Sequence, residues 1–598
     1  MRILLIFGLS VIMAFYLTEF IRRFLRISLH QKSLHFPHSF IGFVLMVSGI
    51  LVGLLGQPLV NPPNDTLLAI ALIGSGFGVI IHHLFANSFI FSERLEQSFM
   101  KEHETLVERL LEILPGALTW LALTSPIWLS FTLPFAVAYL ILLADIYWLF
   151  SAIRISVLIY IGYNRMQKAK KQDWQRRLET DFPGDWNKYS HLILLPTYKE
   201  GLAIIEPTFN AIAASTSPHQ KIFLSVGFEE WDDPDRVATI KEFLDKNAHK
   251  IGGVFISTHK LQTGEVKGPG TNRNWMVNSA VTKLKEKNIN LKDVLVTTID
   301  ADFVLHPQFL PGMLHKYLST PLAERNKRSF TGVFLYNNNY WQAPTPMRVI
   351  ATGTAFWQIS EMVGSDKYIN FASLSINMQT LLDMGLWLPN KVNDDAGFYW
   401  KSYYFFNGDY KVIPHYLPIS ADTVQDVSLL KTFQNQYLQL KRWAYGVEHI
   451  PFIFKQFFTK KDMDFWDKTD KLTFIVWSYF KWGTLALFIT FGGLFIPLIN
   501  PGYAQSVVYY NLSVVSSWIL TAAFIGLFST IYFNEKIAPP RPANWSRLKR
   551  IWSYVQWILV PIILISITTL PAIDAQTSLM LKRYLEFRVT NKARVSPS

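Results

Sequence analysis

Apolar positions gather in two long blocks, residues 1–163 and 471–575, and the stretch between them mixes short apolar runs with charged residues. A helix that crosses a bilayer needs roughly 20 mostly apolar residues. Runs of that length predict seven or eight membrane-spanning helices. The candidates are 3–20, 39–61, 66–90, 114–131, 134–160, 472–497, 508–533 and 553–573. The pattern therefore predicts a multi-pass membrane protein with a water-soluble insert.

Basic residues in the short polar segments predict the direction of insertion, because loops rich in Lys and Arg stay in the cytosol. Such residues cluster in 21–38, 161–177 and 534–552, whereas loop 62–65 has none. This distribution predicts an external N-terminus and a cytosolic middle. The expected domains are an N-terminal membrane region (1–163), a cytosolic domain (164–470) and a C-terminal membrane region with a basic tail (471–598).

The last apolar segment, 553–573, does not fit this scheme simply. The tail after it is basic, yet a full crossing would carry that tail outside. Pro561 and Pro571 interrupt the segment. Two alternatives stay open: the segment is re-entrant, or the tail after it lies along the inner membrane surface as an amphipathic helix.

The middle of the chain has the pattern of an α/β domain. Short apolar runs predict buried strands, and helical patterns lie between them, as at 201–215. The predicted strands are 191–196, 222–226, 253–257 and 294–299. Such alternation predicts a parallel sheet with helices on both faces, whose ligands bind beyond the carboxyl ends of the strands.

Polar clusters follow each predicted strand, at 196–200, 229–233, 264–278 and 300–302. The last is Asp300-Ala-Asp302, and two carboxylates at that spacing suit Mg²⁺ or Mn²⁺ bound to a diphosphate. The spacing alone is weak evidence for a metal site, because Asp-x-Asp also occurs by chance in many solvated turns.

Charge and cysteine content narrow the chemistry further. The chain has 57 Lys and Arg against 44 Asp and Glu, a net charge of +13, and it has no cysteine. Cytosolic loops beside anionic headgroups explain the excess of positive charge, so no nucleic-acid partner is expected. The lack of cysteine excludes disulfides, thiolate nucleophiles and cysteine-ligated metals.

Three motifs occur in the order typical of the membrane-bound family 2 glycosyltransferases, which include cellulose, chitin and hyaluronan synthases. Residues 194–200 (LLPTYKE) resemble the opening strand end of that family, and Asp300-Ala-Asp302 resembles its metal motif. Residues 439–443 (QLKRW) fit its Gln-x-x-Arg-Trp signature. Asn393-Asp394-Asp395 stands where the family usually has Glu-Asp. The resemblance covers about residues 188–460.

The resemblance implies a Rossmann-like nucleotide-diphospho-sugar transferase domain of the GT-A type. Asp395 would be the general base, with Asp394 beside it in the catalytic motif. Asp302 and Asp300 would hold Mg²⁺ or Mn²⁺. Arg442 would face the pyrophosphate, Trp443 would stack on an acceptor sugar, and Gln439 would hydrogen-bond on the same helix face.

The same resemblance implies a set of donor contacts, and no histidine is expected in the site. The implied donor-binding residues are Pro196, Tyr198, Glu200, Glu229, Glu230, Lys267, Asn272, Asn278 and Asp300. The chain departs from the family at Lys199, which replaces an Asn, and at Asp394, which replaces a Glu. Neither change removes a key carboxylate.

The expected activity is an inverting transfer from a nucleotide sugar, in particular a UDP-sugar, to a polysaccharide or glycolipid at the plasma (inner) membrane, with export of the product. Membrane lipids are expected partners. Single addition to a lipid carrier remains an alternative, because it needs the same donor chemistry. A transporter with a nucleotide-binding insert is less favoured, since the spans carry few ionisable residues.

Overall fold

The computed structural model describes residues 72–73, 75–76, 103–364, 368–369, 371–460 and 462–587. Residues 105–463 and 467–598 belong to one compact unit. Residues 1–104 with 464–466 belong to another. The predicted spans 3–20 and 39–61, and nearly all of 66–90, lie outside the described residues.

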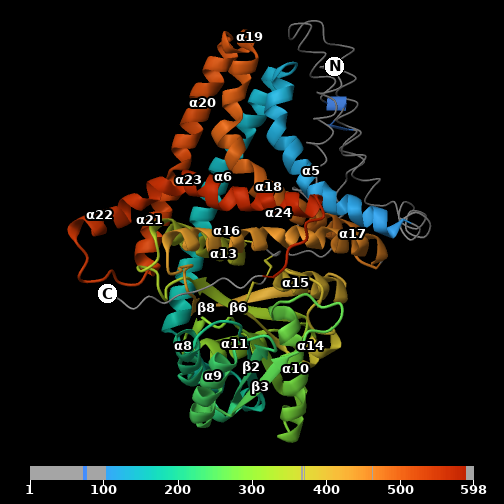
Figure 1. The fold of residues 1–598 in the computed structure, drawn as a ribbon, viewed down its shortest axis with the longest axis vertical. Helices are drawn as coiled ribbons and strands as arrows, with labels where there is room; N and C mark the ends of the chain where they lie inside the picture. Colours follow the sequence, from blue (N-terminus) through green and yellow to red (C-terminus); the bar gives the residue numbers. More distant parts are fainter. Residues whose placement is uncertain are drawn as a thin grey trace. The chain divides into compact units, whose positions relative to one another are not determined.

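An eight-stranded mixed sheet forms the centre of the α/β domain (Figure 1). Its strand order is β3-β2-β1-β4-β7-β6-β8-β5. The strands are β1 Ser190–Pro196, β2 Ile222–Glu229, β3 Gly253–His259, β4 Val294–Thr298, β5 Val304–Leu305, β6 Arg328–Leu335, β7 Leu374–Asn377 and β8 Lys411–Ser420. Strands β1 to β4 are parallel, whereas β7 pairs antiparallel with both β4 and β6.

The four predicted strands are therefore confirmed, and the expectation of an all-parallel sheet holds for that half alone. The strands of the other half were not predicted, because their own sequences are weak strand signals. Strand β7 has four residues, and β8 contains Pro414 and Pro418 and pairs with β6 across an irregularity between Thr331 and Val333. Short or proline-containing runs are weak strand signals.

Helices cover both faces of the sheet. The elements of this domain are α7 Trp174–Asp181, η2 Trp186–Lys188, α8 Leu202–Ala213, η3 His219–Lys221, α9 Pro234–Asn247, η4 Ala248–Lys250, α10 Pro269–Glu286, η5 Leu291–Asp293, α11 Phe309–Ser319, α12 Leu322–Arg325, α13 Thr345–Gly364, α14 Met378–Asp383, α15 Asp394–Phe405, α16 Leu429–Ala444, η6 Tyr445–His449 and α17 Ile450–Thr459.

Alternate side chains of β1 enter two separate cores, which is why its sequence is apolar throughout. Leu192 and Leu194 pack in the core that contains Met276 of α10. Ile193 and Leu195 pack in the core that contains the apolar side chains of α8 and α9. The strand ends are thereby held at one edge of the sheet.

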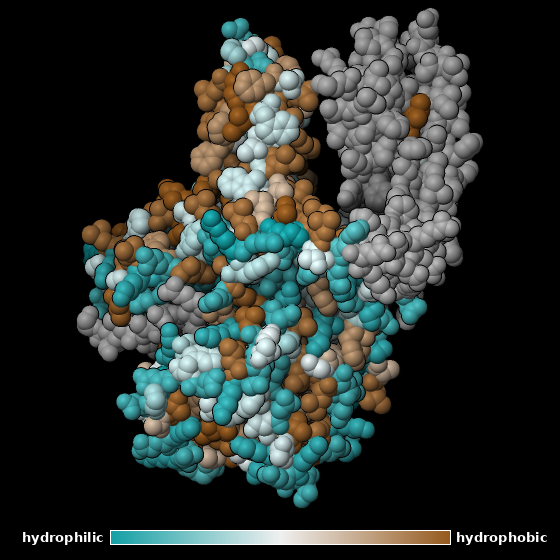
Figure 2. All heavy atoms as spheres, turned by 45° about the vertical axis from the view of Figure 1, so that its right-hand side comes forward, coloured by the Kyte–Doolittle hydropathy of each residue, from teal (hydrophilic) through white to brown (hydrophobic). Residues whose placement is uncertain are grey.

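Five described helices are long and apolar enough to cross a membrane: Glu104–Ser130, Pro134–Lys171, Phe465–Ile499, Val507–Ile537 and Arg547–Met580. They correspond to the five later spans predicted from the sequence. The helical elements in this part are α5 Glu104–Ser130, α6 Pro134–Lys171, α18 Phe465–Ile499, α19 Pro501–Ala504, α20 Val507–Ala523, α21 Ile525–Ile537, α22 Arg547–Val555, η7 Gln556–Leu559, α23 Val560–Ile563, η8 Leu564–Thr569 and α24 Leu570–Met580. Figure 2 shows a mostly hydrophobic surface on these upper helices and a largely hydrophilic one on the α/β domain.

The last apolar segment differs from the other four in direction. Figure 1 shows α22, α23 and α24 running transverse to α6, α18 and α20. Helix α24 packs along α16, and Asp574 of α24 accepts hydrogen bonds from Tyr437 and Lys441 of α16. These contacts hold the last apolar segment against α16, and whether it crosses the membrane, re-enters it or is followed by a tail along its surface stays a prediction.

Candidate active site

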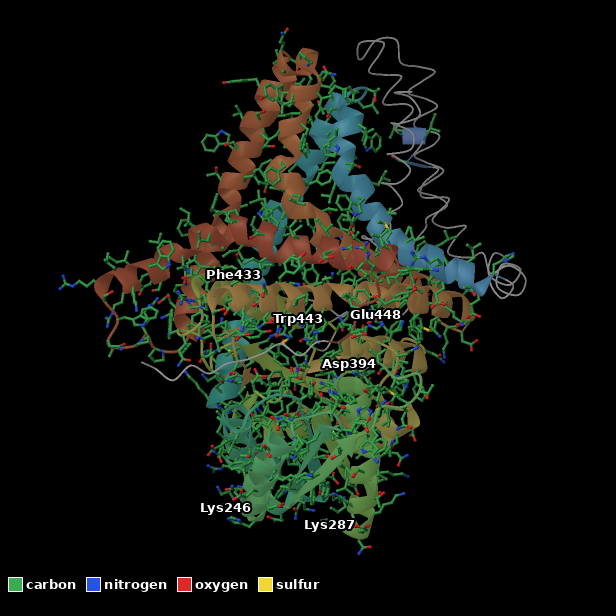
Figure 3. The ribbon with its side chains drawn as sticks, viewed as in Figure 1. Lys246, Lys287, Asp394, Phe433, Trp443 and Glu448 are labelled. Carbon is green, nitrogen blue, oxygen red and sulfur yellow. The ribbon has the colours of Figure 1, made fainter. Side chains whose placement is uncertain are left out.

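The predicted motifs meet where the strand ends of the sheet face helix α16. The first turn of α10, the first turn of α15 and the C-terminal half of α16 come together there. Figure 3 shows Asp394, Trp443 and Glu448 on the side of the α/β domain that faces the apolar helices, with Lys246 and Lys287 at the opposite end.

Arg273 of α10 links three carboxylates in this region. Its Nη1 donates to Asp394 Oδ2 at 2.5 Å and to Asp395 Oδ1 at 3.0 Å, and its Nη2 lies 3.6 Å from Asp300 Oδ1. The Arg273 side chain is 1% exposed. Gly270 permits this approach, since a Cβ there would lie 2.8 Å from the Cβ of Asp394. A single buried cation thus joins the predicted metal motif to the predicted catalytic motif.

Asp394 and Asp395 lie in the first turn of α15, where the helix dipole favours negative charge. Burial nevertheless raises the pKa of both, and Arg273 opposes that rise. Asp394 also raises the pKa of Asp395, to about 6, whereas the Asp395 side chain keeps a fifth of its surface exposed. Asp395 is therefore the more accessible carboxylate, with a pKa suited to accepting a proton near neutral pH.

The two carboxylates of the predicted metal motif have different surroundings. Asp302 is buried, and its Oδ2 accepts a hydrogen bond from the backbone N–H of Asp422 at 2.7 Å. Asn338 donates through Nδ2 to the Asp302 carbonyl and to Asp422 Oδ1, both at 2.8 Å. Asp300 remains 41% exposed. Asp302 is thus held rigidly while Asp300 reaches into the crevice.

These two carboxylates suit a hard divalent cation. Within the described ranges, no three His, Asp or Glu side chains are grouped to hold a metal ion. Mg²⁺ typically takes one or two protein carboxylates and completes its shell with water and substrate phosphates. The donor set of Asp300 and Asp302 therefore fits a metal that binds together with a diphosphate, rather than a closed structural site.

Glu229, at the end of β2, is held between two partners. Its Oε2 lies 2.7 Å from His259 Nδ1, and its Oε1 accepts from Asn272 Nδ2 at 2.9 Å. The other ring nitrogen of His259 lies 3.1 Å from Glu265 Oε2. Burial lowers the pKa of His259, but the two carboxylates outweigh burial and raise it. The network fastens the loop after β3 to the end of β2.

The segment after β1 folds back on itself. Glu200 Oε2 accepts from the Tyr198 N–H at 2.8 Å and from the Thr197 hydroxyl at 3.0 Å. Lys199 between them has a φ of 73°, a left-handed conformation that bulky residues rarely adopt and that is frequent at functional sites. Pro196 ends β1 immediately before this turn.

Aromatic rings line the same corner of the site. Tyr198 and Trp231 meet edge to face with ring centroids 6.4 Å apart, and Lys267 Nζ lies 5.0 Å from the Trp231 ring. Tyr198 and Lys267, both predicted donor contacts, therefore share Trp231 as a neighbour. Flat rings beside a cation suit a nucleotide base and its phosphates.

Two predicted donor residues lie at the margin of this arrangement. Glu230 is exposed, and its Oε1 accepts from the Leu261 N–H at 3.3 Å. Asn278 is exposed on α10, six residues beyond Asn272 and away from the helix N-terminus that carries Arg273. The structure brings Glu230 to the loop after β3, whereas Asn278 lies outside the cluster.

Helix α16 carries the three residues of the QLKRW motif. Gln439 Oε1 accepts from Gln436 Nε2 at 3.2 Å, and Trp443 packs in an apolar cluster with Trp482 of α18. The carboxylates of Asp300, Asp394 and Asp395 act electrostatically on Arg442, whose pKa is lowered by burial. The Arg442 Nε is buried and has no hydrogen-bond partner among the residues that the structure describes. An anionic ligand would satisfy this group.

Phe587, beyond α24, covers part of this site. The Arg442 guanidinium lies over the Phe587 ring, 4.6 Å from its centroid. A Cβ at Gly268 would lie 3.5 Å from the same ring. Phe587 therefore lies between the loop that precedes α10 and the arginine of α16.

Asn393 joins the predicted catalytic motif to the end of α16 through three hydrogen bonds. Its backbone N–H donates to Glu448 Oε1 at 2.7 Å, its Nδ2 donates to the Trp443 carbonyl at 3.3 Å, and its own carbonyl lies 2.8 Å from His449 Nε2. Burial raises the pKa of Glu448 to about 7 and lowers that of His449 to about 3. Asp394 and Asp395 thus have a fixed position relative to Trp443.

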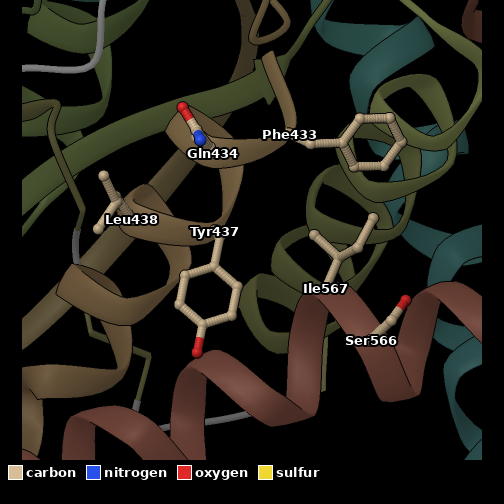
Figure 4. Close-up of a pocket in the computed structure, with 6 residues that line it drawn as sticks. All are labelled: Phe433, Gln434, Tyr437, Leu438, Ser566 and Ile567. Atoms are coloured by element: carbon tan, nitrogen blue, oxygen red, sulfur yellow. The ribbon is translucent and has the colours of Figure 1, made fainter. Parts of the chain in front are cut away.

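A pocket of about 710 Å³ lies between α16 and the π-helical turn η8 (Figure 4). It is lined by Phe433, Gln434, Tyr437, Leu438, Ser566 and Ile567. Two aromatic rings, an amide and a hydroxyl are groups that contact sugars or amphipathic lipids. The pocket is on the helix that also carries Gln439, Arg442 and Trp443.

The sequence reading missed four residues that the structure brings to the site: Arg273, His259, Glu448 and Phe587. One of them had a usable signal, because Arg273 directly follows the predicted donor residue Asn272 at the start of a helix. The others gain their positions from contacts between distant segments, which periodicity and spacing do not encode.

Comparison with known proteins gives a likeness of fold. No protein-family model and no curated protein matches the chain. A Pyrobaculum calidifontis mannosyltransferase solved with GDP-Man and Mn²⁺ is 12% identical, with a TM-score of 0.37 over 72% of this chain and 100% of that one. Residues 1–349 of S. aureus TarS, solved with UDP-GlcNAc, are 13% identical, with a TM-score of 0.28 over 55% of this chain and 90% of that one.

A third solved structure, GalNAc-T7 with UDP, GalNAc and Mn²⁺, is 9% identical, with a TM-score of 0.29 over 49% of this chain and 58% of that one. Scores of this size carry no functional argument. The chain itself has a mixed α/β sheet domain joined to several long apolar helices, and a functional assignment has to come from the geometry of its own site.

Proposed function

We propose that this chain is an inverting glycosyltransferase that transfers a sugar from a nucleotide-sugar donor, in particular a UDP-sugar, to a glycan or glycolipid at the membrane. One observation carries the proposal: buried Arg273 gathers Asp300, Asp394 and Asp395, from two separate motifs, at one point. A metal-and-diphosphate site beside a carboxylate base is an arrangement that supports sugar transfer from a nucleotide, because it stabilises the leaving group and activates the acceptor hydroxyl.

In this reaction Asp395 takes the proton of the acceptor hydroxyl while that oxygen attacks the anomeric carbon. The bond from the anomeric carbon to the phosphate oxygen breaks on the opposite face, and its electron pair leaves with the nucleoside diphosphate. Attack from the opposite face inverts the anomeric centre. Arg442, with its unpartnered buried Nε, binds the diphosphate, where a planar guanidinium suits phosphate oxygens.

Asp300 and Asp302 would hold Mg²⁺ or Mn²⁺, which supplies positive charge to the departing diphosphate. Asn272 and Glu229 hold the end of β2 in place, and Tyr198 and Lys267 meet at Trp231, where the base and phosphates of the donor would lie. Pro196, Glu200, Glu230 and Asn278 remain proposed donor-side residues.

The acceptor side is assigned to α16. Trp443 stacks on the acceptor sugar, Gln439 bonds to it, and the pocket lined by Phe433 and Tyr437 receives the chain beyond it. The catalytic domain is placed in the cytosol and the apolar helices in the plasma (inner) membrane, because basic residues cluster in the segments that join them. Export of a growing glycan between the helices is part of this proposal.

A donor screen with the purified full-length protein tests the proposal. Nucleoside diphosphate release and sugar incorporation are measured with different nucleotide sugars, with and without Mg²⁺ or Mn²⁺. We expect metal-dependent transfer with one donor class, abolished by Asp302→Asn. A folded protein that transfers from no donor would refute the assignment and favour the transporter alternative.

Product length separates the two transferase alternatives. A ladder of products on a sizing gel supports a polymer, whereas a single added sugar supports the alternative in which the acceptor is a lipid carrier. Phe433→Ala and Tyr437→Ala are expected to shorten a ladder with little effect on donor hydrolysis, because both side chains lie in the pocket and away from the carboxylates.

A further inference from the structure

An exposed apolar stripe runs along the transverse segment from α22 into α23. Its members recur every three or four residues, so they share one helix face. They are Leu548 (78% exposed), Ile551 (58%), Val555 (45%), Ile558 (69%) and Ile562 (64%). Side chains of this kind normally face a protein core, so this face has a partner other than the described part of the chain.

The opposite side of the same segment is polar and fixed to the protein. Ser553 Oγ accepts from Arg541 Nε at 2.9 Å. At the edge of the stripe, the Trp552 indole, 45% exposed, donates to Thr345 Oγ1 at 3.1 Å. The buried Gln556 Oε1 accepts from Arg348 Nε at 3.1 Å and Nη2 at 2.9 Å. These bonds prevent the helix from rolling its apolar face inward.

Three exposed bases stand on α22: Arg547 and Arg550 lie at the edges of the stripe, and Lys549 lies on the helix face that carries Ser553. In the part of the chain that the structure describes, none of the three forms an ion pair, and the helix has no acidic residue. A helix with an apolar face flanked by Lys and Arg lies in the plane of a membrane surface, and its bases attract anionic headgroups.

We propose that α22 is a docking surface for the anionic face of a lipid bilayer. Leu548, Ile551 and Val555 enter the boundary between headgroups and acyl chains, while Arg547, Lys549 and Arg550 contact lipid phosphates. Continuity supports a bilayer as the occupant, because the stripe extends without a break into α23 and the apolar segment that follows. Charge complementarity selects anionic lipid.

The lack of cysteine in the chain allows a direct test with the full-length protein. Leu548→Cys carries an environment-sensitive fluorophore, and Asn544→Cys, in the exposed loop before α22, is the matched control. Both proteins are reconstituted in phosphatidylcholine vesicles with or without phosphatidylglycerol. Neither position belongs to the candidate active site, and neither readout requires catalysis.

With phosphatidylglycerol present, we expect the label at 548 to shift to shorter wavelengths and to be quenched by a quencher carried on the acyl chains. The label at 544 stays accessible to a water-soluble quencher. In a protein that also carries Arg547→Gln, Lys549→Gln and Arg550→Gln, the response to phosphatidylglycerol should disappear, since each base contributes about fivefold to surface binding.

A label at 548 that remains exposed to water in both vesicles would overturn the proposal. So would equal quenching with and without phosphatidylglycerol, or protection that depends on protein concentration in detergent, which would indicate a second copy of the chain. Loss of sugar transfer in every lipid, with the label still buried in anionic vesicles, would instead count against the proposed function alone.

Discussion

Arg273 and Asp394 form a buried ion pair, with Nη1 and Oδ2 2.5 Å apart, although 121 residues separate them in the chain. The same guanidinium bonds to Asp395 and lies beside Asp300. Asp394 therefore holds Arg273 in place, and the proposed function gives Asp395, which is more exposed, the contact with the acceptor. The two adjacent acids have different tasks because their surroundings differ.

Asp395→Asn should lower sugar transfer by about 10²- to 10⁴-fold, the usual contribution of a general base. The fold should survive. Burial raises the pKa of this carboxylate, which means that its ionised form destabilises the folded protein, and a neutral amide removes that penalty. Activity and thermal unfolding of the purified protein are the two measurements. Transfer at an unchanged rate would remove Asp395 from the mechanism.

The rate should depend on pH through the same group. Asp395 accepts a proton only when ionised, and its pKa is about 6. We expect kcat/KM to fall as pH is lowered through about 6 and to level off above it, measured from about pH 5 to about pH 8. A profile that is flat across this range, with the protein still folded, would contradict the assignment.

Arg273→Met should destabilise the domain by about 3 to 5 kcal/mol, because it leaves buried Asp394 without its partner. The expected result is a lower unfolding temperature together with lost activity. Arg176→Met, at an exposed position in the first turn of α7, is the control and should change little. Equal stability of the two variants would mean that the ion pair contributes nothing.

Asn338→Ala should weaken metal binding by about 10- to 100-fold, the usual effect of removing a residue that orients a ligand. Its amide holds both the Asp302 backbone and the Asp422 carboxylate. The Mn²⁺ concentration for half-maximal activity is the measurement. Asn337→Ala is the matched control, since that amide bonds to Ile537 at the end of α21, and its metal requirement should match that of the unmodified protein.

His259→Ala should raise the KM for the donor by roughly tenfold with a smaller effect on kcat. Without the imidazole, Glu229 and Glu265 lose the ring that bonds to both of them, and the loop after β3 loosens. His249→Ala, at an exposed turn, is the control. A change confined to kcat would indicate that His259 acts on the chemical step instead.

The local hydrophobic pattern was sufficient to predict strands β1 to β4, because a strand buried on both faces of a sheet has to be apolar throughout. It also identified the polar strand ends and the later apolar helices, since bilayer thickness sets a length that any sequence displays. Asp300, Asp302, Asp394 and Asp395 could be named because their short, contiguous motifs resemble those of the membrane-bound family 2 glycosyltransferases, and their roles stay predictions.

Tertiary structure decided what those residues are joined to. The bond between Arg273 and Asp394 and the placement of His259 between Glu229 and Glu265 depend on contacts across the fold, which spacing in the chain does not specify. The direction of the last apolar segment was decided in the same way. Its length and composition permit a crossing, but bonds from Asp574 to α16 and from Gln556 to Arg348 hold it against the α/β domain. Hydrophobic pattern sets which surfaces are buried, and partners distant in sequence set where each surface lies.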